Sequence, residues 1–322
     1  MPSGEDDLIA RYFQPLAVDP GAFGLIDDVA VLTNAADDLV VTTDAIVEGV
    51  HFLSTDPPDT IARKALRVNL SDIAAKGARP AGFVLTLALR QMNDAWLAPF
   101  ARALGEDAAA FGCPLLGGDT VSTPGPLMIS VTAFGHVAAG RTVRRSGAKA
   151  GDRVVVSGTI GDAVLGLALL GGKISGAGMD AAALIERYRV PQPRNALAPS
   201  VLDYATAAMD VSDGLAGDLA KLCKASGVTA DIELRSIPLS AAARALTETG
   251  AITLEKLICG GDDFEILCTV PESQIAEFRR SAALAGVPVS VIGVIREGDG
   301  LPRFIDSGGR ARVFERGSFS HF

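Results

Sequence analysis

The chain has 322 residues, of which 48% are hydrophobic, so it can bury the cores of two ordinary domains and is not intrinsically disordered. Its net charge of −9 argues against a nucleic acid or an anionic membrane as partner, but metal ions can still make an acidic site attractive to phosphate. No secretory signal is recognisable and no apolar stretch reaches the roughly 18 residues of a membrane helix, so we expect a cytoplasmic protein. The four cysteines form no C-x-x-C motif and are expected to be free thiols.

The order of apolar runs and turn-forming residues predicts that strands and helices follow one another along the first half of the chain. The expected elements are a helix that Ser3 begins, strands over 29–33 and 39–44, a helix over 60–76 that Gly77 ends, a strand over 83–89, a helix from Asn93 to Phe111 and a strand over 127–136. Residues 115–116 are expected to lead into a loop with the sequence GGDT.

A basic, glycine-rich segment at 138–152 lacks apolar periodicity and is interpreted as the junction between domains over 1–137 and 153–322. The elements expected beyond it are strands over 153–157, 208–211, 228–234, 264–270 and 287–295, helices over 161–170, 240–249 and 273–285, a helical stretch over 180–207 interrupted at 190–193, and a helix that Ser212 caps. Because both halves mix strands and helices, the pattern predicts an α/β (α+β mixed) protein of two sandwich-like domains.

Six short acidic segments each place an aspartate at the edge of an apolar run, and in five of them it stands beside Gly, Ser or Thr. They are residues 26–32, 42–52, 69–77, 116–121, 209–219 and 260–267. One such segment is a turn, but six in one chain suggest a single site that folding assembles for several divalent cations and the phosphates they carry. Two like charges about 4 Å apart repel by about 4 kcal/mol at an effective dielectric constant of ~20, so the acids are either dispersed and solvated or neutralised by cations.

The first segments differ in how well a purely structural role explains them. Asp44 ends an apolar strand beside Thr42 and Thr43, and oxygen ligands of this kind suit Mg²⁺. Turn chemistry is the alternative, and it explains Asp27 and Asp28 equally well.

The helical segments are harder to explain as turns. Asp72 lies in a helix among apolar residues, with Asn69 and Lys76 on the same face. Because a buried carboxylate needs a partner, we favour a polar stripe that faces the site over a solvated face. Asp210 ends a strand, and Asp213 lies in the first turn of the next helix, where free N–H groups attract anions.

No P-loop and no protein-kinase motif occurs, and GTIGDA at 158–163 is interpreted as a tight turn rather than a cofactor loop. None of the three histidines is marked as part of a nucleophile system. Phosphoryl transfer needs little acid–base help, and none if the acceptor is a phosphate oxyanion. Arg144 and Arg145 suit a phosphate clamp, although a basic linker is usually only solvated.

Taken together and in this order, the segments resemble the thiamine-monophosphate kinase family, as do DLIARYF at 7–13 and the final HF at 321–322. That family is part of an ATP-binding superfamily with aminoimidazole ribonucleotide (AIR) synthetase, selenophosphate synthetase and a hydrogenase-maturation factor. The resemblance implies a two-domain AIR synthetase-like fold, in which the N-terminal domain dimerises through its strands and the C-terminal domain closes over the site. It also implies phosphorylation of thiamine monophosphate by ATP to thiamine diphosphate, by direct in-line transfer with several Mg²⁺ ions and no general base.

The resemblance further implies roles for individual residues. The Mg²⁺ ligands would be Asp28, Thr42, Thr43, Asp44, Asp72, Asp119, Asp210 and Asp213. ATP would contact Gly118, Asp119, Arg145 and Ser212, and the substrate would contact His51, Asp262 and Phe319. The sequence departs from the family pattern at Ile26, where glycine is usual, at Asp262, where glutamate is usual, and around Phe319, where SFSHF replaces an aromatic-Asp-His-Phe motif.

Two alternatives stay open. The first is another ATP-dependent enzyme of the superfamily, but selenophosphate synthetase would need a reactive cysteine near the N-terminus, and the first one here is Cys113. The maturation factor would need a C-terminal cysteine where this chain has Phe322, and AIR synthetase fits the segments EGVHF and DLIARYF less well. The second alternative is a nucleotide-binding protein without catalysis.

Overall fold

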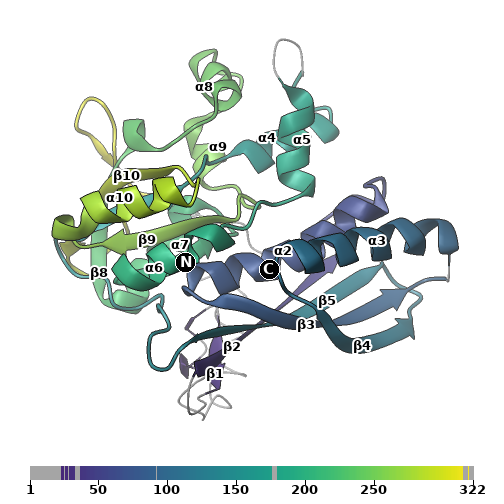
Figure 1. Cartoon of the computed structure of the whole chain (residues 1–322). Helices are drawn as coiled ribbons and strands as arrows, with labels where there is room; N and C mark the ends of the chain where they lie inside the picture. The colour runs from purple at the N-terminus through teal and green to yellow at the C-terminus, as the bar shows by residue number, and fades with distance from the viewer. Residues whose placement is uncertain are drawn as a thin grey trace.

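The computed structural model describes residues 23–24, 26–27, 29–32, 37–91, 93–175, 180–314 and 318. Figure 1 shows two halves side by side, the N-terminal half in purple and blue and the C-terminal half in green and yellow. Each half has one β-sheet with helices packed on it, which confirms the mixed α/β fold that the sequence predicts.

The described part of the N-terminal half contains a five-stranded sheet in the order β1-β2-β5-β3-β4. Its elements are β1 (Ala30–Leu32), β2 (Asp37–Val47), α2 (Pro58–Ala75), β3 (Arg79–Leu89), α3 (Asp94–Ala110), β4 (Leu115–Ser122) and β5 (Met128–Ala138). Helices α2 and α3 lie over one face of this sheet (Figure 1). That face is apolar because strand residues alternate: in β5, Ile129, Val131 and Ala133 are buried and their neighbours are half-buried.

The described part of the C-terminal half contains a seven-stranded sheet in the order β12-β11-β8-β10-β6-β9-β7. Its strands are β6 (Arg153–Ser157), β7 (Ala207–Val211), β8 (Val228–Glu233), β9 (Glu265–Val270), β10 (Val289–Glu297), β11 (Arg303–Ile305) and β12 (Ala311–Arg312). Its helices are α4 (Asp162–Leu170), α5 (Ala181–Arg189), α6 (Ala198–Tyr204), α7 (Leu215–Ser226), α8 (Ala241–Glu248), α9 (Leu254–Ile258) and α10 (Ile275–Leu284). Val154 and Val156 of β6 pack on the side of α7, and Val155 packs on the opposite side with Phe278 of α10.

Helix α2 lies between the two halves, and this position decides where the site forms. Leu66, Leu70 and Ile73 pack in the core of the N-terminal half, while Ala74 and Ala75 pack with the second sheet. A helix that is covered on two sides must bury its polar residues as well, so each of those needs a partner within the protein.

The structure differs from the sequence expectations in several elements. The GGDT segment is not a loop but part of β4, because its backbone pairs with β3 in parallel. The short elements α9, β11 and β12 were not predicted, and the helix expected from Ser3 lies outside the described residues. All four cysteines lie in the described ranges and are free, as predicted. No helix in the described ranges is long and apolar enough to cross a membrane.

Candidate functional site

Strand β2 and helix α2 bring together the acidic segments at 42–52 and 69–77. The Thr42 hydroxyl donates a hydrogen bond to Asp72 Oδ2 at 2.6 Å, and the Asp44 backbone N–H donates to Asn69 Oδ1 at 3.0 Å. Thr42 and Asp44 are two residues apart, so they share the face of β2 that packs against α2. Asn69 and Lys76 are fully buried and Asp72 nearly so, which confirms a buried polar stripe rather than a solvated face.

The same alternation turns the Thr43 side chain away from this cluster. Its hydroxyl donates to the Val131 carbonyl at 3.1 Å and accepts a hydrogen bond from the Thr132 hydroxyl at 2.9 Å, both on β5. Of the two threonines predicted as metal ligands, the structure therefore places only the Thr42 hydroxyl beside Asp72.

Three carboxyls from both halves of the chain form the centre of the site: Asp44, Asp72 and Asp210. Burial, repulsion by Asp210 and repulsion by Asp44 raise the pKa of Asp72 well above its usual range, although Thr42 and Lys76 oppose the shift. Burial is also the largest cause that raises the pKa of Asp210, to about 7. Asp44 keeps access to solvent, but partial desolvation and repulsion by Asp213 raise its pKa to about 6.

These carboxyls share a site without forming a ready-made cage for one ion. In the part of the chain that the structure describes, no three acidic, imidazole or thiol groups are arranged to hold a metal ion together. Magnesium usually takes only one or two protein carboxylates and completes its shell with water and phosphate oxygens. The donor chemistry therefore fits Mg²⁺. Burial, and after it repulsion between carboxylates, raises the pKa values of Asp44, Asp72 and Asp210, and a bound cation would favour their ionised forms.

The turn before α7 is held by an aspartate that the sequence analysis overlooked. Asp218 Oδ2 accepts hydrogen bonds from the backbone N–H groups of Ser212, Asp213 and Gly214 at 3.0–3.1 Å. Ser212 is therefore not the helix cap that we expected: α7 begins at Leu215, and a carboxylate inside its first turn does the capping. Those three N–H groups already bind Asp218, so an anion at this turn would rely on side chains.

The GGDD segment lies directly against this turn. The Asp262 backbone N–H donates to the Ser212 carbonyl at 2.8 Å, and the Phe264 N–H donates to the Val211 carbonyl at 2.8 Å. A Cβ atom at Gly261 would come within 2.4 Å of the Ser212 carbonyl oxygen, so only glycine permits this approach. Asp262 itself has φ +71°, a conformation that non-glycine residues rarely adopt.

Asp262 and His51 approach each other from opposite halves of the chain. Lys64 of α2 donates to the His51 carbonyl at 2.8 Å and to Asp262 Oδ2 at 2.9 Å. The Val47 N–H donates to His51 Nδ1 at 3.0 Å, so a neutral His51 carries its proton on Nε2. The structure thus brings together two of the three residues predicted to bind the substrate; Phe319, the third, lies outside the described residues.

Asp27 has a structural partner on either side. Its carboxylate pairs with Lys76 at 2.8 Å and accepts a hydrogen bond from the Arg145 backbone N–H at 2.8 Å. Asp27 therefore ties the start of the chain to the end of α2 and to the junction. The pKa of Lys221 is raised, because Asp218 and Asp213 outweigh the opposing effects of burial and of the nearby Arg145. Asp28, the predicted ligand beside Asp27, lies outside the described residues.

The LGGDT segment lies in the described residues but away from the cluster of Asp44, Asp72 and Asp210. Asp119 lies on the edge strand β4, which β5 and β3 separate from β2. At about 4.8 Å between strands, that places it roughly 14 Å from the strand of Asp44. Glycine at position 118 is required by strand packing alone, because a Cβ atom there would come within 1.9 Å of the Leu85 carbonyl oxygen.

GTIGDA is a turn, as predicted. The Gly161 N–H donates to both carboxylate oxygens of Asp263, at 2.8 and 3.0 Å, so this backbone binds a protein carboxylate. Glu265, two residues further on, is fully buried and pairs with Arg187 and Arg194. The second half of GGDDFE thus has a structural role, whereas Asp262 faces the site.

Sequence reasoning missed Lys64 and Asp218, although each left a signal. Lys64 stands among apolar residues of a predicted helix, where a buried ammonium needs an acidic partner. Asp218 is an acid in the first turn of a helix, where it can accept backbone hydrogen bonds.

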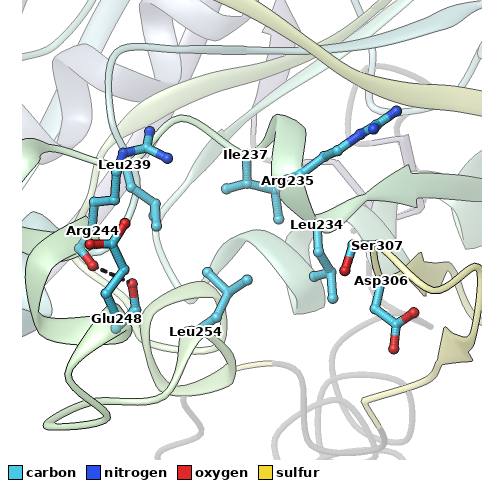
Figure 2. A pocket seen from close by; sticks show the side chains of 10 residues that line it. Leu234, Arg235, Ile237, Leu239, Arg244, Glu248, Leu254, Asp306 and Ser307 are labelled. Atoms are coloured by element: carbon cyan, nitrogen blue, oxygen red, sulfur yellow. Dashed lines mark hydrogen bonds between the residues drawn. The ribbon is translucent and has the colours of Figure 1, made fainter.

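The carboxylate cluster does not coincide with the pocket that the described residues form near α8. Figure 2 shows that pocket in the C-terminal half, lined among others by Leu234, Ile237, Leu254, Arg235 and Asp306. None of the predicted site residues lines it. The site is therefore identified by its functional side chains and not by a pocket.

Fold and site together define an AIR synthase-related protein: the models of the N-terminal and C-terminal domains of that family match residues 26–137 and 149–305. Thiamine-monophosphate kinase of Caulobacter vibrioides is 47% identical over 94% of this chain and 87% of its own length, and that of Escherichia coli K12 is 40% identical over 91% and 90%. The chain therefore belongs to the thiamine-monophosphate kinase family.

Solved structures give the same result. AaThiL complexed with AMPPCP and TMP has a TM-score of 0.82 at 31% identity, and the match covers 94% of this chain and 97% of that one. Hydrogenase maturation protein HypE in complex with ATP has a TM-score of 0.71 at 18% identity, which shows a common fold only.

Proposed function

We propose that this protein transfers the γ-phosphoryl group of ATP to the phosphate of thiamine monophosphate, giving ADP and thiamine diphosphate. In direct in-line transfer, the bond from the γ-phosphorus to the bridging oxygen of ADP breaks as the bond to the acceptor phosphate oxygen forms. The acceptor oxygen is already an anion, so no side chain has to remove a proton from it. The site agrees with this mechanism, because its segments share carboxylates and none of them is marked as supplying a general base.

One observation carries the proposal: Asp44, Asp72 and Asp210 converge from three segments and both halves of the chain, and repulsion by Asp44 adds to burial in raising the pKa of both Asp72 and Asp210. Burying acids together is costly unless cations arrive with the substrate. Phosphoryl transfer depends on such cations and on positioning, and little on acid–base chemistry. The family membership supports the same reaction.

Magnesium is the cation that this donor set fits. Asp44, Asp72, Asp210 and Asp213 would hold the ions, with Thr42 orienting Asp72. When bound, the ions would neutralise the phosphate oxygens. The predicted contributions of Asp28 and Thr43 remain part of the proposal.

The nucleotide and substrate contacts are proposed as the resemblance implies them. Arg145 and Ser212 flank the Asp213 turn and suit ATP, together with Gly118 and Asp119. His51 and Asp262 suit the thiamine part, because they offer a donor and an acceptor from opposite halves; Phe319 completes this set. The domain limits 1–137 and 153–322, the 138–152 junction and a cytoplasmic location also remain predictions.

A second copy of the chain is the proposed partner, bound through the edge strand β4. Every residue of β4 is exposed, including Leu115, Leu116 and Val121. A long apolar edge with unpaired backbone groups is a template for pairing with another chain. The same strand carries Asp119, so the dimer would also decide where that residue lies.

Product analysis tests the proposal. The purified protein is incubated with ATP, Mg²⁺ and either thiamine monophosphate or free thiamine, and the products are separated by chromatography. We expect equal amounts of ADP and thiamine diphosphate from the monophosphate and no phosphorylation of free thiamine. Binding of Mg-ATP without turnover would instead support a nucleotide-binding protein without catalysis.

A further inference from the structure

Lys64 is a buried lysine on α2, and its ammonium group lies where the two proposed substrate-binding segments meet. Its Nζ atom donates to the His51 carbonyl and to Asp262 Oδ2, and lies 4.0 Å from the centroid of the Tyr188 ring. An ammonium has three N–H groups, so two acceptors and one ring face account for all of them. With 2% of its side chain exposed, Lys64 can influence a ligand only through these neighbours.

Asp262 is the first neighbour through which Lys64 acts. The Asp262 side chain is 29% exposed, and Lys64 holds its Oδ2 atom. No described residue donates a hydrogen bond to its Oδ1 atom. Lys64 therefore leaves one oxygen of this carboxylate, in a fixed orientation, for a donor on a ligand.

His51 is the second neighbour, and Lys64 fixes its backbone. The His51 carbonyl accepts hydrogen bonds from Lys64 at 2.8 Å and from the Tyr188 hydroxyl at 3.4 Å. The imidazole is fixed separately, by the Val47 N–H. The buried Lys64 ammonium thus links His51 of the N-terminal half, whose imidazole can donate to a ligand, to Asp262 of the C-terminal half, whose carboxylate can accept.

We infer that Lys64 is a positioning residue for the aminopyrimidine part of the substrate. By holding Asp262 Oδ2, it presents Oδ1 to the exocyclic amine of the ring, and by holding the His51 carbonyl it keeps both segments in register. The lysine also compensates the charge of Asp262, so recognition depends on the direction of a hydrogen bond rather than on net charge. This inference rests on the proposed function, because it names how the same site selects its substrate.

The test compares Lys64→Met with Lys224→Met, the same substitution at an exposed lysine of α7. Lys64→Met should raise KM for thiamine monophosphate at least about tenfold and leave KM for ATP within about twofold, a tenfold change being about 1.4 kcal/mol. It should also lower the preference for thiamine monophosphate over an analogue with an oxo group in place of the amine. Lys224→Met should match the wild type in all three quantities.

Equilibrium binding of thiamine monophosphate, measured by calorimetry, separates this inference from the proposed function. If the wild type binds the ligand but does not turn it over, the proposed function fails, while weaker binding by Lys64→Met would still support the inference. A folded Lys64→Met variant with wild-type affinity and preference would overturn it, as would equal losses for ATP and thiamine monophosphate.

Should Lys64→Met not fold, Tyr188→Leu provides a second test. It removes the ring face and the hydroxyl but leaves Lys64 and Asp262 in place. We expect a smaller rise in KM, again for thiamine monophosphate alone. No change in that KM would overturn the inference.

Discussion

The hydroxyl of Thr42 on β2 donates a hydrogen bond of 2.6 Å to the Oδ2 atom of Asp72 on α2. This bond favours the ionised form of a carboxyl that burial and two other aspartates push toward the neutral form. It also fixes which oxygen of Asp72 is turned toward β2, and so leaves the other for a cation.

Thr42→Val should therefore weaken activation by Mg²⁺. Valine keeps the shape of threonine but removes a hydrogen bond to a charged group, which is worth about 1.5–3 kcal/mol. We expect the Mg²⁺ concentration for half-maximal turnover to rise by about tenfold. Thr229→Val removes a hydroxyl on β8 of the second sheet, away from the cluster, and is the control. Equal Mg²⁺ requirements in both variants would contradict a role of Thr42 in the cation site.

The stability of the metal-free protein should fall as the pH rises. The pKa of Asp210 is raised to about 7 in the folded state, so the folded protein binds more protons than the unfolded chain between about pH 4 and 7. The free energy of unfolding therefore decreases across this range and is level above it, with a loss of at most about 4 kcal/mol from this group.

Thermal denaturation in the presence of a chelator measures this effect. The melting temperature should be higher at pH 5.5 than at pH 8, and Mg²⁺ with ATP should raise it most at pH 8, where the carboxyls are ionised. Asp210→Asn should reduce the dependence on pH. A melting temperature that rises steadily from pH 5.5 to 8 would contradict a raised pKa of Asp210 in the folded protein.

Asp218→Ala should destabilise the turn that carries Ser212 and Asp213. The substitution leaves three backbone N–H groups without their acceptor and Lys221 without one of its partners. We expect a loss of about 3 kcal/mol in urea denaturation, as for other buried charges that lose a partner. Asp203→Ala removes an exposed carboxylate that pairs with Arg141, and should change stability by less than about 1 kcal/mol. Similar losses in both variants would refute this account of the turn.

Leu116→Lys should dissociate the proposed dimer. Leu116 is 62% exposed on the edge strand β4, and a charge on an edge strand opposes pairing between chains. Sedimentation velocity should show a dimer for the wild type and a monomer for this variant. Leu284→Lys changes an exposed leucine on α10, 86% accessible, and should leave the dimer intact. A monomeric wild type would rule out this interface.

Local sequence patterns predicted most helices and strands, because apolar periodicity records which faces are buried. They also predicted the polar stripe of Asn69, Asp72 and Lys76, since three polar residues at helical spacing share a face. They could not show that α2 is covered on both sides, because that depends on how the two halves pack. For the same reason Lys64 was overlooked, as its partners lie 13 and 198 positions away in the chain.

The GGDT segment shows another limit. Its glycines and its aspartate resemble those of GGDD, and a loop was expected at GGDT. In β4, however, Gly118 is required by close pairing with Leu85 of β3, a contact between strands that no local pattern records. The prediction that Ser212 caps α7 was wrong for a similar reason. Asp218 accepts hydrogen bonds from the N–H groups that a serine cap would have bound.

The turnover of Asp72→Asn is the most direct test of the central claim, that acids from both halves of the chain form one site for cations and phosphates. Asparagine keeps the size of the side chain and accepts the Thr42 hydrogen bond, but it removes one charge from the buried cluster. At saturating ATP, Mg²⁺ and thiamine monophosphate, we predict that kcat falls at least about 100-fold while the melting temperature without metal is equal or higher. A folded Asp72→Asn variant with the wild-type kcat would contradict the claim.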